Sequence, residues 1–449
     1  MSGNARAGRL SERRWLIVLA LVVAALAVVA AGCGGGDEEG AATTTETTAC
    51  GTVTIGAFAD GGLTPFKEKI IPLAKEAGYD IEWLEDEYGV TLEKWFADAQ
   101  NEAGQYDIYL LDDPWVPQFA AADVLEDLGA AGIDGEDSDW IAPMIDMGYW
   151  PPREGPRVKG FEDADPTLVA LPFVGDLQTM TYRNDVFTEG APATWDEIIE
   201  KGKEGVAAGT IKYPIVFRGV ASNPIVTSWY PVFLSYGGAF FDDSWNVTFN
   251  DEKGKAAADF FVTTMKENAP PGVVEYDSDQ EGAAILGGDA GAIIQYSGNA
   301  LKSDDPAQSQ VVGKLDFGVV PKQEEAIGQM GIFIAAVPKG APHKDCATSF
   351  LAWYTSAETQ AALSEAGSIP VKRSAFEVAN PGNRLIPVAL EQIDAGSEPR
   401  PRTPDWAKVE EILGIELNKA LQAGSGGGEA LDTAAEKVTD YLTQQGYYD

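Results

Sequence analysis

Carboxylates and an aromatic side chain stand together where two apolar runs end. Asp60 follows the run 53–58, and Asp112, Asp113 and Trp115 follow a second such run. A carboxylate can accept hydrogen bonds from two neighbouring hydroxyls or hold a cation, and a flat aromatic ring adds apolar contact. Two carboxylates can also serve as acid and base in glycoside hydrolysis. The residue types therefore favour a polar small molecule and leave three uses open: a polyhydroxylated ligand, a cation, or a glycoside to be cleaved.

A single histidine narrows the catalytic options. His343 stands in a loop before a predicted helix, where we expect a surface residue. A Ser-His-Asp triad would need this histidine, and a zinc site would need more His or Cys than the chain holds. We therefore expect no metal site, no cofactor and no hydrolytic triad.

The elements that must position the carboxylates alternate between strands and helices. The predicted strands are 53–58, 79–84 and 106–111, and the predicted helices between them are 66–77 and 92–103. This alternation predicts right-handed crossovers and a parallel sheet. Because ligands bind such sheets beyond the carboxyl ends of the strands, the acids lie where a binding site is expected.

The first residues carry the parts of a secretory signal. Arg6, Arg9, Arg13 and Arg14 precede the apolar segment 15–31 and the pair Gly32-Cys33. A basic start, an apolar core and a small-residue exit are typical of export signals. The ending on cysteine resembles that of bacterial lipoproteins, which implies a lipidated Cys33 that anchors the chain to the membrane. An uncleaved membrane-spanning anchor is the alternative, because a run of this length can just span a bilayer.

The expected organisation follows from this start. Residues 1–32 form the signal peptide, and residues 33–52 form a flexible linker rich in Gly, Thr and acid. Close to four hundred residues remain, too many for one hydrophobic core, so two lobes are expected. Cys50 and Cys346 are a possible disulfide in an exported chain, although sequence alone leaves both the bridged and the free state open.

The charge of the chain excludes some partners. The formal net charge is −38, and removing residues 1–32 leaves 28 basic and 69 acidic residues, a net charge of −41. We expect no binding to nucleic acid, because that affinity comes from Lys and Arg on phosphates. The acids are scattered along the chain, which favours a solvated surface over a dedicated trap for cations such as polyamines. We expect a monomer.

Five stretches carry a resemblance to a known family. They are residues 106–128, 171–187, 192–197, 237–241 and 333–347. In the second stretch Arg183-Asn184 replaces a commoner Asn-Lys, and in the third Thr194 and Glu197 can form a capping box. In this order and spacing the chain resembles the substrate-binding proteins of ABC sugar importers (extracellular solute-binding protein family 1). The resemblance covers nearly all of the chain from residue 53.

The resemblance implies a fold and a function. The fold would be α/β, the two-lobed type II fold of periplasmic binding proteins, with a ligand cleft between lobes and hinge crossovers around residues 179–182 and 318–331. The lobes would comprise 53–180 with 332–371, and 181–331 with 372–449. The protein would capture a carbohydrate, a mono- or disaccharide or a sugar alcohol, outside the cytoplasm and deliver it to the permease subunits of the importer. It would not be an enzyme.

The resemblance also suggests further ligand contacts beside Asp60, Asp112, Asp113 and Trp115. They are Asp176, Arg218, Tyr296, Gly331 and Arg373, and Trp229 and Trp406 are further candidates by residue type. Several of these have equally simple structural roles: Trp229 as a core residue of a helix, Arg218 as a surface ion-pair partner, and Trp406 as the start of a helix.

Two other classes of function stay open at this point. A polyamine-binding protein of the same fold would need several acids converging on the cleft, and Arg218 and Arg373 in the cleft would argue against it. A secreted carbohydrate-active enzyme would need two suitably spaced carboxylates, but the sequence carries no enzyme motif.

Overall fold

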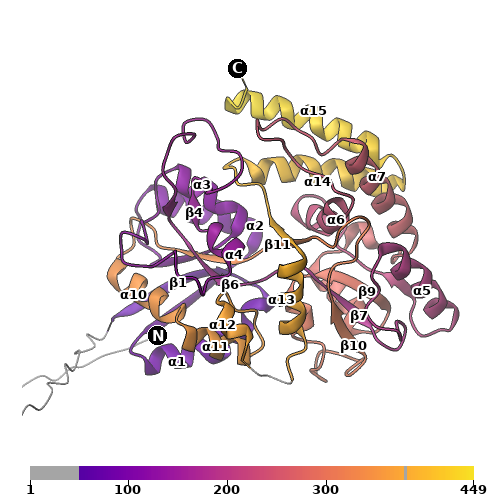
Figure 1. Cartoon of the computed structure of the whole chain (residues 1–449), viewed down its shortest axis with the longest axis horizontal. Coiled ribbons are helices and arrows are strands. Elements are labelled where there is room, and N and C mark those ends of the chain that lie inside the picture. Colours follow the sequence, from indigo (N-terminus) through magenta and orange to yellow (C-terminus); the bar gives the residue numbers. More distant parts are fainter. Residues whose placement is uncertain (1–49, 379–381, 449) are drawn as a thin grey trace, which may run out of the picture. The chain divides into compact units, whose positions relative to one another are not determined.

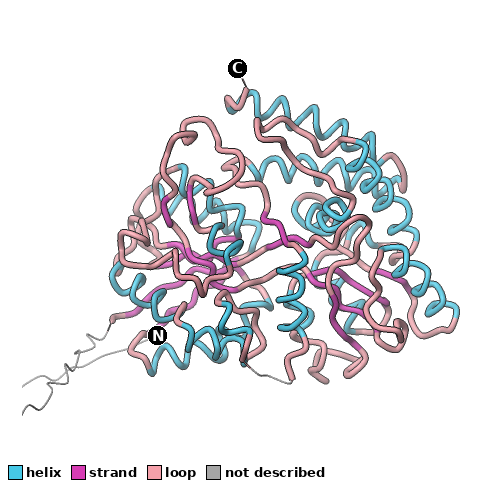
Figure 2. Tube along the Cα trace, in the orientation of Figure 1, coloured by secondary structure: helices cyan, strands magenta, loops and turns pink. Residues whose placement is uncertain are grey.

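Two separate β-sheets organise the part of the chain that the structure describes. This structure is a computed structural model, and it describes residues 50–378 and 382–448. The predicted signal peptide, Cys33 and most of the predicted linker lie outside these residues. Figure 2 shows the strands gathered in two groups with helices around each.

The first sheet has the order β2-β1-β3-β12-β6. Its strands are β1 (Thr52–Phe58), β2 (Asp80–Asp86), β3 (Ile108–Asp112), β6 (Leu171–Val174) and β12 (Phe333–Ala336). β1 runs parallel to β2 and β3, as the alternation of strands and helices predicts, but β12 runs antiparallel to both β3 and β6. The sheet is therefore mixed and not parallel throughout, because β12 enters from the distant part of the chain without a helical crossover from β3.

The second sheet has the order β10-β7-β9-β8. Its strands are β7 (Thr179–Arg183), β8 (Tyr213–Ile215), β9 (Ala290–Gln295) and β10 (Leu315–Gly318). β7 pairs antiparallel with β9 and β10, and β8 pairs parallel with β9. In Figure 1 these strands lie to the right of β1 and β6.

The chain crosses between the two sheets twice, and two short two-stranded ladders lie outside them. The chain leaves the first sheet after β6 and enters the second at β7, and it returns between β10 and β12. On the return, β11 (Gly328–Met330) pairs parallel with β13 (Ser397–Pro399), so a third segment lies beside the second passage. A further two-stranded ladder joins β4 (Tyr149–Trp150) to β5 (Thr167–Leu168).

Helices surround both sheets. The α-helices are α1 (Ile71–Glu76), α2 (Tyr88–Gln100), α3 (Val116–Ala121), α4 (Ala142–Asp146), α5 (Trp195–Ala207), α6 (Asn223–Ser235), α7 (Glu252–Phe260), α8 (Ser278–Leu286), α9 (Ser297–Ala300), α10 (Lys344–Tyr354), α11 (Ala357–Glu365), α12 (Arg373–Phe376), α13 (Leu385–Ala395), α14 (Trp406–Ala423) and α15 (Gly427–Gln445). Short 3₁₀ or π turns are η1 (Gly61–Leu63), η2 (Phe66–Ile70), η3 (Asp113–Trp115), η4 (Phe261–Met265) and η5 (Val273–Glu275). α14 and α15 pack against each other and cover the second sheet's helices α6 and α7.

Local sequence explains most of these boundaries. The predicted cap of α5 is present, because Thr194 Oγ1 accepts from the backbone N–H of Glu197 at 3.2 Å. The Glu197 carboxylate accepts from Ala193 N, one residue before the cap. α2 begins four residues earlier than the predicted helix 92–103.

Each sheet has its own hydrophobic core. In the first, Phe66, Phe173 and Tyr354 meet with ring centroids 4.0 to 5.5 Å apart. In the second, Trp229 stacks on Phe233 at 4.4 Å. α13 contributes buried residues to the first core and also contacts β7 and β10 of the second sheet. The exact residues at which the predicted lobes divide remain a prediction.

A disulfide closes most of the described chain into one loop. Cys50, just before β1, is bonded to Cys346 of α10, with the two Cα atoms 5.5 Å apart and 296 positions between them in sequence. The Cα separation is usual for disulfides. Because α10 packs on the first core, the bond ties the start of β1 to its own part of the molecule.

Candidate ligand-binding site

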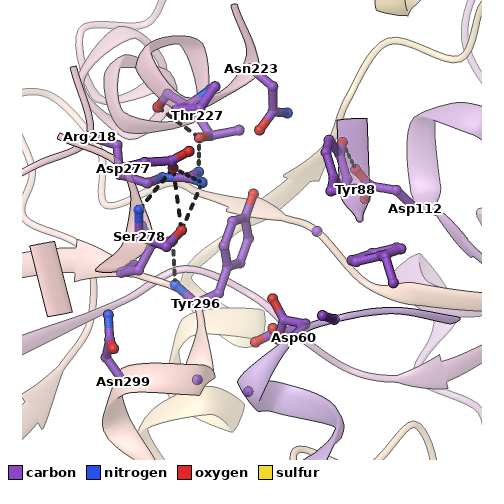
Figure 3. A pocket seen from close by; sticks show the side chains of 18 of the residues that line it. Asp60, Tyr88, Asp112, Arg218, Asn223, Thr227, Asp277, Ser278, Tyr296 and Asn299 are labelled. Atoms are coloured by element: carbon purple, nitrogen blue, oxygen red, sulfur yellow. Dashed lines mark hydrogen bonds and ion pairs between the residues drawn. The ribbon is translucent and has the colours of Figure 1, made fainter. Parts of the chain in front are cut away.

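A cavity of about 460 Å³ opens between the ends of the two sheets. Six of the eleven predicted contacts line it: Asp60, Asp112, Asp176, Arg218, Tyr296 and Gly331. Sequence reasoning missed further lining residues, among them Phe58, Tyr88, Asn223, Thr227, Asp277, Ser278, Asn299, Lys302, Phe333 and Arg400. In Figure 3 the side chain of Tyr296 stands between the group around Arg218 and the Tyr88–Asp112 pair.

Asp112 lines the cavity, but its two carboxylate oxygens are already occupied. Oδ1 accepts from the backbone N–H of Asp113 at 3.0 Å and from Arg400 Nη2. Oδ2 accepts from the Tyr88 hydroxyl at 2.7 Å and from Arg400 Nη1 at 3.0 Å. A carboxylate offers about four acceptor positions, so Asp112 has none left for a ligand in this arrangement. Its role here is to hold Tyr88 and Arg400.

Asp113 and Trp115 do not line the cavity. Asp113 is fully buried, and its Oδ1 accepts from Arg400 Nε at 3.0 Å. Trp115 packs behind the cavity wall, with ring centroids 5.7 Å from Phe58 and 5.0 Å from Tyr88. The turn η3 directly after β3 carries both side chains away from the cavity, so the predicted direct contacts are replaced by supporting ones.

The two predicted tryptophans of the second core are also away from the cavity. Trp229 lies inside α6, fully buried and stacked on Phe233. Trp406 begins α14, is fully buried, and meets Phe240 edge-to-face at 5.1 Å. Both rings fill space between helices, which is the structural role that the sequence also allowed.

Arg373 lies at the start of α12 and not in the cavity. Its side chain is half-exposed, and its nearest acid, Asp394, is 3.9 Å away. The cation that enters the cavity from the last quarter of the chain is instead Arg400, which is almost fully buried.

Two other carboxylates retain acceptor capacity. Asp60 follows β1, and its Oδ1 accepts from the backbone N–H of Gly62 at 2.7 Å. Asp176 follows β6, is almost fully buried, and its Oδ1 accepts from Ser297 N at 2.8 Å. Burial, with a smaller contribution from Asp60, raises the pKa of Asp176 to about 7. These carboxylates are the available hydrogen-bond acceptors for a ligand on this side.

The raised pKa of Asp176 predicts a pH dependence of stability. Burial also raises the pKa of Glu281, which lies behind the cavity, to about 7. A carboxyl with a higher pKa in the folded chain binds its proton more tightly there. This tighter proton binding stabilises the folded chain fully at a pH below the pKa of the unfolded chain, and the stabilisation is lost as the pH rises through about 7. We therefore expect the unfolding temperature to increase between about pH 8 and about pH 5.

The matched variant is Asp176→Asn, measured by thermal unfolding across the same pH range. Other acids titrate in both the wild type and the variant, so the difference between the two slopes isolates the part due to Asp176. An unchanged slope in Asp176→Asn would contradict the assignment of the raised pKa to this residue.

Arg218 supplies donors on the opposite wall. Its Nη2 donates to Thr227 Oγ1, and its Nη1 donates to Ser278 Oγ at 3.4 Å and lies 3.6 Å from a carboxylate oxygen of Asp277. Its Nε is buried and has no partner within the protein. Thr227, Ser278 and Asp277 thus hold the guanidinium of Arg218 in place (Figure 3).

The ring of Tyr296 depends on a glycine beside it. The Tyr296 hydroxyl donates to Gln329 Oε1 at 2.7 Å. A Cβ on Gly331 would lie 2.5 Å from the ring, well inside van der Waals contact. Gly331 therefore allows the return segment to pass directly against the aromatic ring that lines the cavity.

The cavity lies between the two sheets and is lined by side chains from both, as expected for a site that binds a small molecule. Residues 60–361 match the family described as bacterial extracellular solute-binding protein. The chain belongs to this family. Membership makes solute binding outside the cytoplasm, and not catalysis, the activity of the protein.

Individual relatives agree with the family. The chain is 24% identical over 381 residues to the probable amino-acid ABC transporter periplasmic-binding protein y4oP of Sinorhizobium fredii, covering 82% of this chain and 84% of the relative. It is 23% identical over 394 residues to the mannitol-binding protein of Pseudomonas aeruginosa, covering 82% and 87%. The crystal structure of a solute-binding protein from Agrobacterium vitis with bound D-mannitol superposes with a TM-score of 0.73 at 23% identity, covering 89% of this chain and all of that one. The predicted two-lobed α/β fold of this extracellular solute-binding family is confirmed.

Two further observations concern the described residues of this family member. Within residues 50–378 and 382–448, no helix is both long enough and apolar enough to cross a membrane. The same residues contain no group of three or more His, Cys, Asp or Glu side chains arranged to hold a metal ion.

Proposed function

We propose that this solute-binding protein captures a carbohydrate, a sugar alcohol or a mono- or disaccharide, and delivers it to the permease of an ABC importer. The observation that carries the proposal is the cavity, where carboxylates with acceptor capacity and a donor-bearing arginine flank an aromatic ring. Asp60 and Asp176 can accept from hydroxyls, the guanidinium of Arg218 lines the same cavity, and Tyr296 offers a ring to the C–H face of a sugar. A volume of about 460 Å³ is in the range of small-molecule sites.

The balance of charge supports a neutral ligand over a cation. Asp112 is matched by Arg400, and Asp277 is matched by Arg218. Lys302 adds a further positive charge to the lining. The first residues of α2, α6 and α8 also line the cavity, and the N-terminal ends of helices carry partial positive charge. Arginines thus pair with two of the five aspartates of the lining, and the presence of three cations in the cavity weakens the polyamine alternative.

Apolar surface in the cavity supports the same conclusion. Phe58 and Phe333 stack with centroids 5.1 Å apart, and both line the cavity on the side of the first sheet. A sugar or polyol has apolar C–H surface between its hydroxyls, and such rings cover it. The two mannitol-binding relatives named above support a polyol in particular.

A thermal-shift screen of the chain from Thr48 onward tests the proposal. The panel comprises hexitols and pentitols, mono- and disaccharides, polyamines and amino acids, the last because one relative is named for them. A ligand that binds only the folded chain adds about 2.7 kcal/mol of stability at a hundredfold excess over its Kd. We expect a clear shift with a polyol or sugar. A shift only with polyamines or only with amino acids would overturn the carbohydrate assignment while leaving the family intact.

We also propose that Cys33 is lipidated, so that the protein is held at the outer face of a membrane and residues 34–48 act as a spacer. The basic start, apolar segment and Gly32-Cys33 exit support this. Mass spectrometry of the N-terminal peptide of the membrane-extracted protein should show a chain that begins at an acylated Cys33. A chain that retains residues 1–32 would favour an uncleaved anchor.

A further inference from the structure

One wall of the cavity is a loop in an unusual backbone conformation. The wall loop, defined as residues 218–223, runs from the connection after β8 to the first residue of α6 and places Arg218, Ser222 and Asn223 in the lining. Ser222 has φ 77° and ψ −143°. A non-glycine residue with such a positive φ is costly, and it persists only where the surroundings fix it. Something outside the cavity must therefore hold the wall loop in place.

One face of α14 fixes the wall loop, together with Tyr276, whose backbone carbonyl accepts from Gly219 N and Val220 N. Glu410, Gly414 and Asn418 are spaced by four residues, so they lie on the same face of the helix. Glu410 and Asn418 are each more than nine-tenths buried although both are polar. No residue of this face lines the cavity.

Each member of the face meets a different point of the wall loop. Glu410 Oε2 accepts from Asn223 Nδ2 at 3.1 Å, and Asn418 Nδ2 donates to the backbone carbonyl of Gly219 at 2.7 Å. Between them, a Cβ on Gly414 would lie 2.4 Å from the carbonyl oxygen of Ser222 and 2.6 Å from its N and Cα. Helix and loop backbones therefore touch at the strained residue, and only glycine permits this approach.

We propose that Glu410, Gly414 and Asn418 are positioning residues that set the ligand selectivity of the cavity from outside it, by fixing the wall loop. The proposal rests on the proposed function, since it concerns the same cavity. Glu410 fixes the side-chain amide of Asn223, which leaves Asn223 Oδ1 as an acceptor for a ligand hydroxyl. Asn418 fixes Gly219, the residue after Arg218, and so holds the donor on the same wall. Gly414 admits the backbone of Ser222.

The first experiment measures the wall loop itself, without ligand. Gly414→Ala in the chain from Thr48 onward is compared with Gly428→Ala of α15, where a Cβ would meet only the side chain of Lys255 at 3.4 Å. We expect hydrogen exchange in peptides covering the wall loop to quicken by about tenfold or more in Gly414→Ala, and not in Gly428→Ala. Exchange in β1 and β3 should be unchanged in both variants.

The second experiment measures selectivity by calorimetry with D-mannitol and its epimer D-glucitol. Glu410→Gln replaces an acceptor-only carboxylate by an amide that can face Asn223 with either its oxygen or its nitrogen, so the orientation of the Asn223 amide is no longer fixed. Its control is Glu411→Gln, whose native carboxylate is half-exposed and paired with Lys408. We expect Glu410→Gln to change the ratio of the two dissociation constants by about tenfold, whereas Glu411→Gln leaves the ratio as in the wild type. A general loss of stability would not alter this ratio.

The outcomes separate the two proposals. Unchanged exchange in Gly414→Ala, or an unchanged ratio in Glu410→Gln, would overturn the positioning role. Failure of the wild-type chain to bind either hexitol would count against a polyol ligand, and the exchange of the wall loop would then decide the positioning role alone. Faster exchange together with an altered ratio supports it.

Discussion

Replacing Arg400 by methionine should cost about 3–5 kcal/mol of the free energy of unfolding, because it strips two buried carboxylates of their partner. Arg400 donates to both oxygens of Asp112 and to Asp113 Oδ1, and its side chain is 2% exposed. Removal leaves Asp113 charged and enclosed, or forces it to take up a proton. The measurement is a urea titration followed by far-UV circular dichroism. Ligand affinity should fall as well, because Arg400 itself lines the cavity and Asp112 would no longer hold Tyr88 in one fixed position.

Arg373→Met is the matched control for this experiment. Arg373 is half-exposed and its closest acid is 3.9 Å away, so we expect a change of less than about 1 kcal/mol. Arg400→Lys gives a second test if the methionine variant does not fold, since lysine keeps the charge but cannot reproduce the paired contacts of a guanidinium. Equal urea midpoints for Arg400→Met, Arg373→Met and the wild type would show that the Arg400 ion pairs contribute nothing.

Loss of the disulfide should have the second large effect. The bond between Cys50 and Cys346 closes a loop of nearly 300 residues, with a sequence separation of 296. A cross-link over a long loop restricts the unfolded chain more than the folded one, and such bonds contribute about 2–4 kcal/mol. We expect the double variant Cys50→Ser, Cys346→Ser to lose stability near the upper end of this range in the same urea titration.

Reducing agent supplies the control for the disulfide. Treatment of the wild type should lower its urea midpoint to that of the double variant, and the double variant itself should not respond. A wild-type midpoint that is the same with and without reductant, while the cysteines are shown to be reduced, would contradict a stabilising role for the bond.

The predicted residues that line the cavity follow from local patterns. Asp60 and Asp112 come directly after apolar runs that form β1 and β3, and these strands are parallel neighbours. Parallel neighbours end at the same edge of a sheet, so both acids reach the cavity. Tyr296 follows β9 in the same way.

The residues that sequence reasoning missed depend on distant parts of the chain. Arg400 stands 288 positions from Asp112, between two prolines in a segment without apolar periodicity, so no local pattern marks it. The ion pair with Arg400 also changes the role of Asp112: its carboxylate, which the sequence suggests is free to bind a ligand, is already occupied in the structure. Trp229 was ambiguous for another reason: α6 is buried on all sides from Ile225 to Ser235, so its pattern does not distinguish a cavity face from a core face.

The strand order of the first sheet also fixes when that sheet can form. β12 lies between β3 and β6, and among the described residues it is the strand that pairs with β6. A chain that emerges from its N-terminal end, from the ribosome or through an export channel, carries β3 and β6 for more than 150 residues before Phe333–Ala336 arrives. Until then one edge of β3 and both edges of β6 have no strand beside them. Cys346 follows β12 closely in the sequence. The last strand of the sheet and the second cysteine of the disulfide therefore become available almost together, late in synthesis.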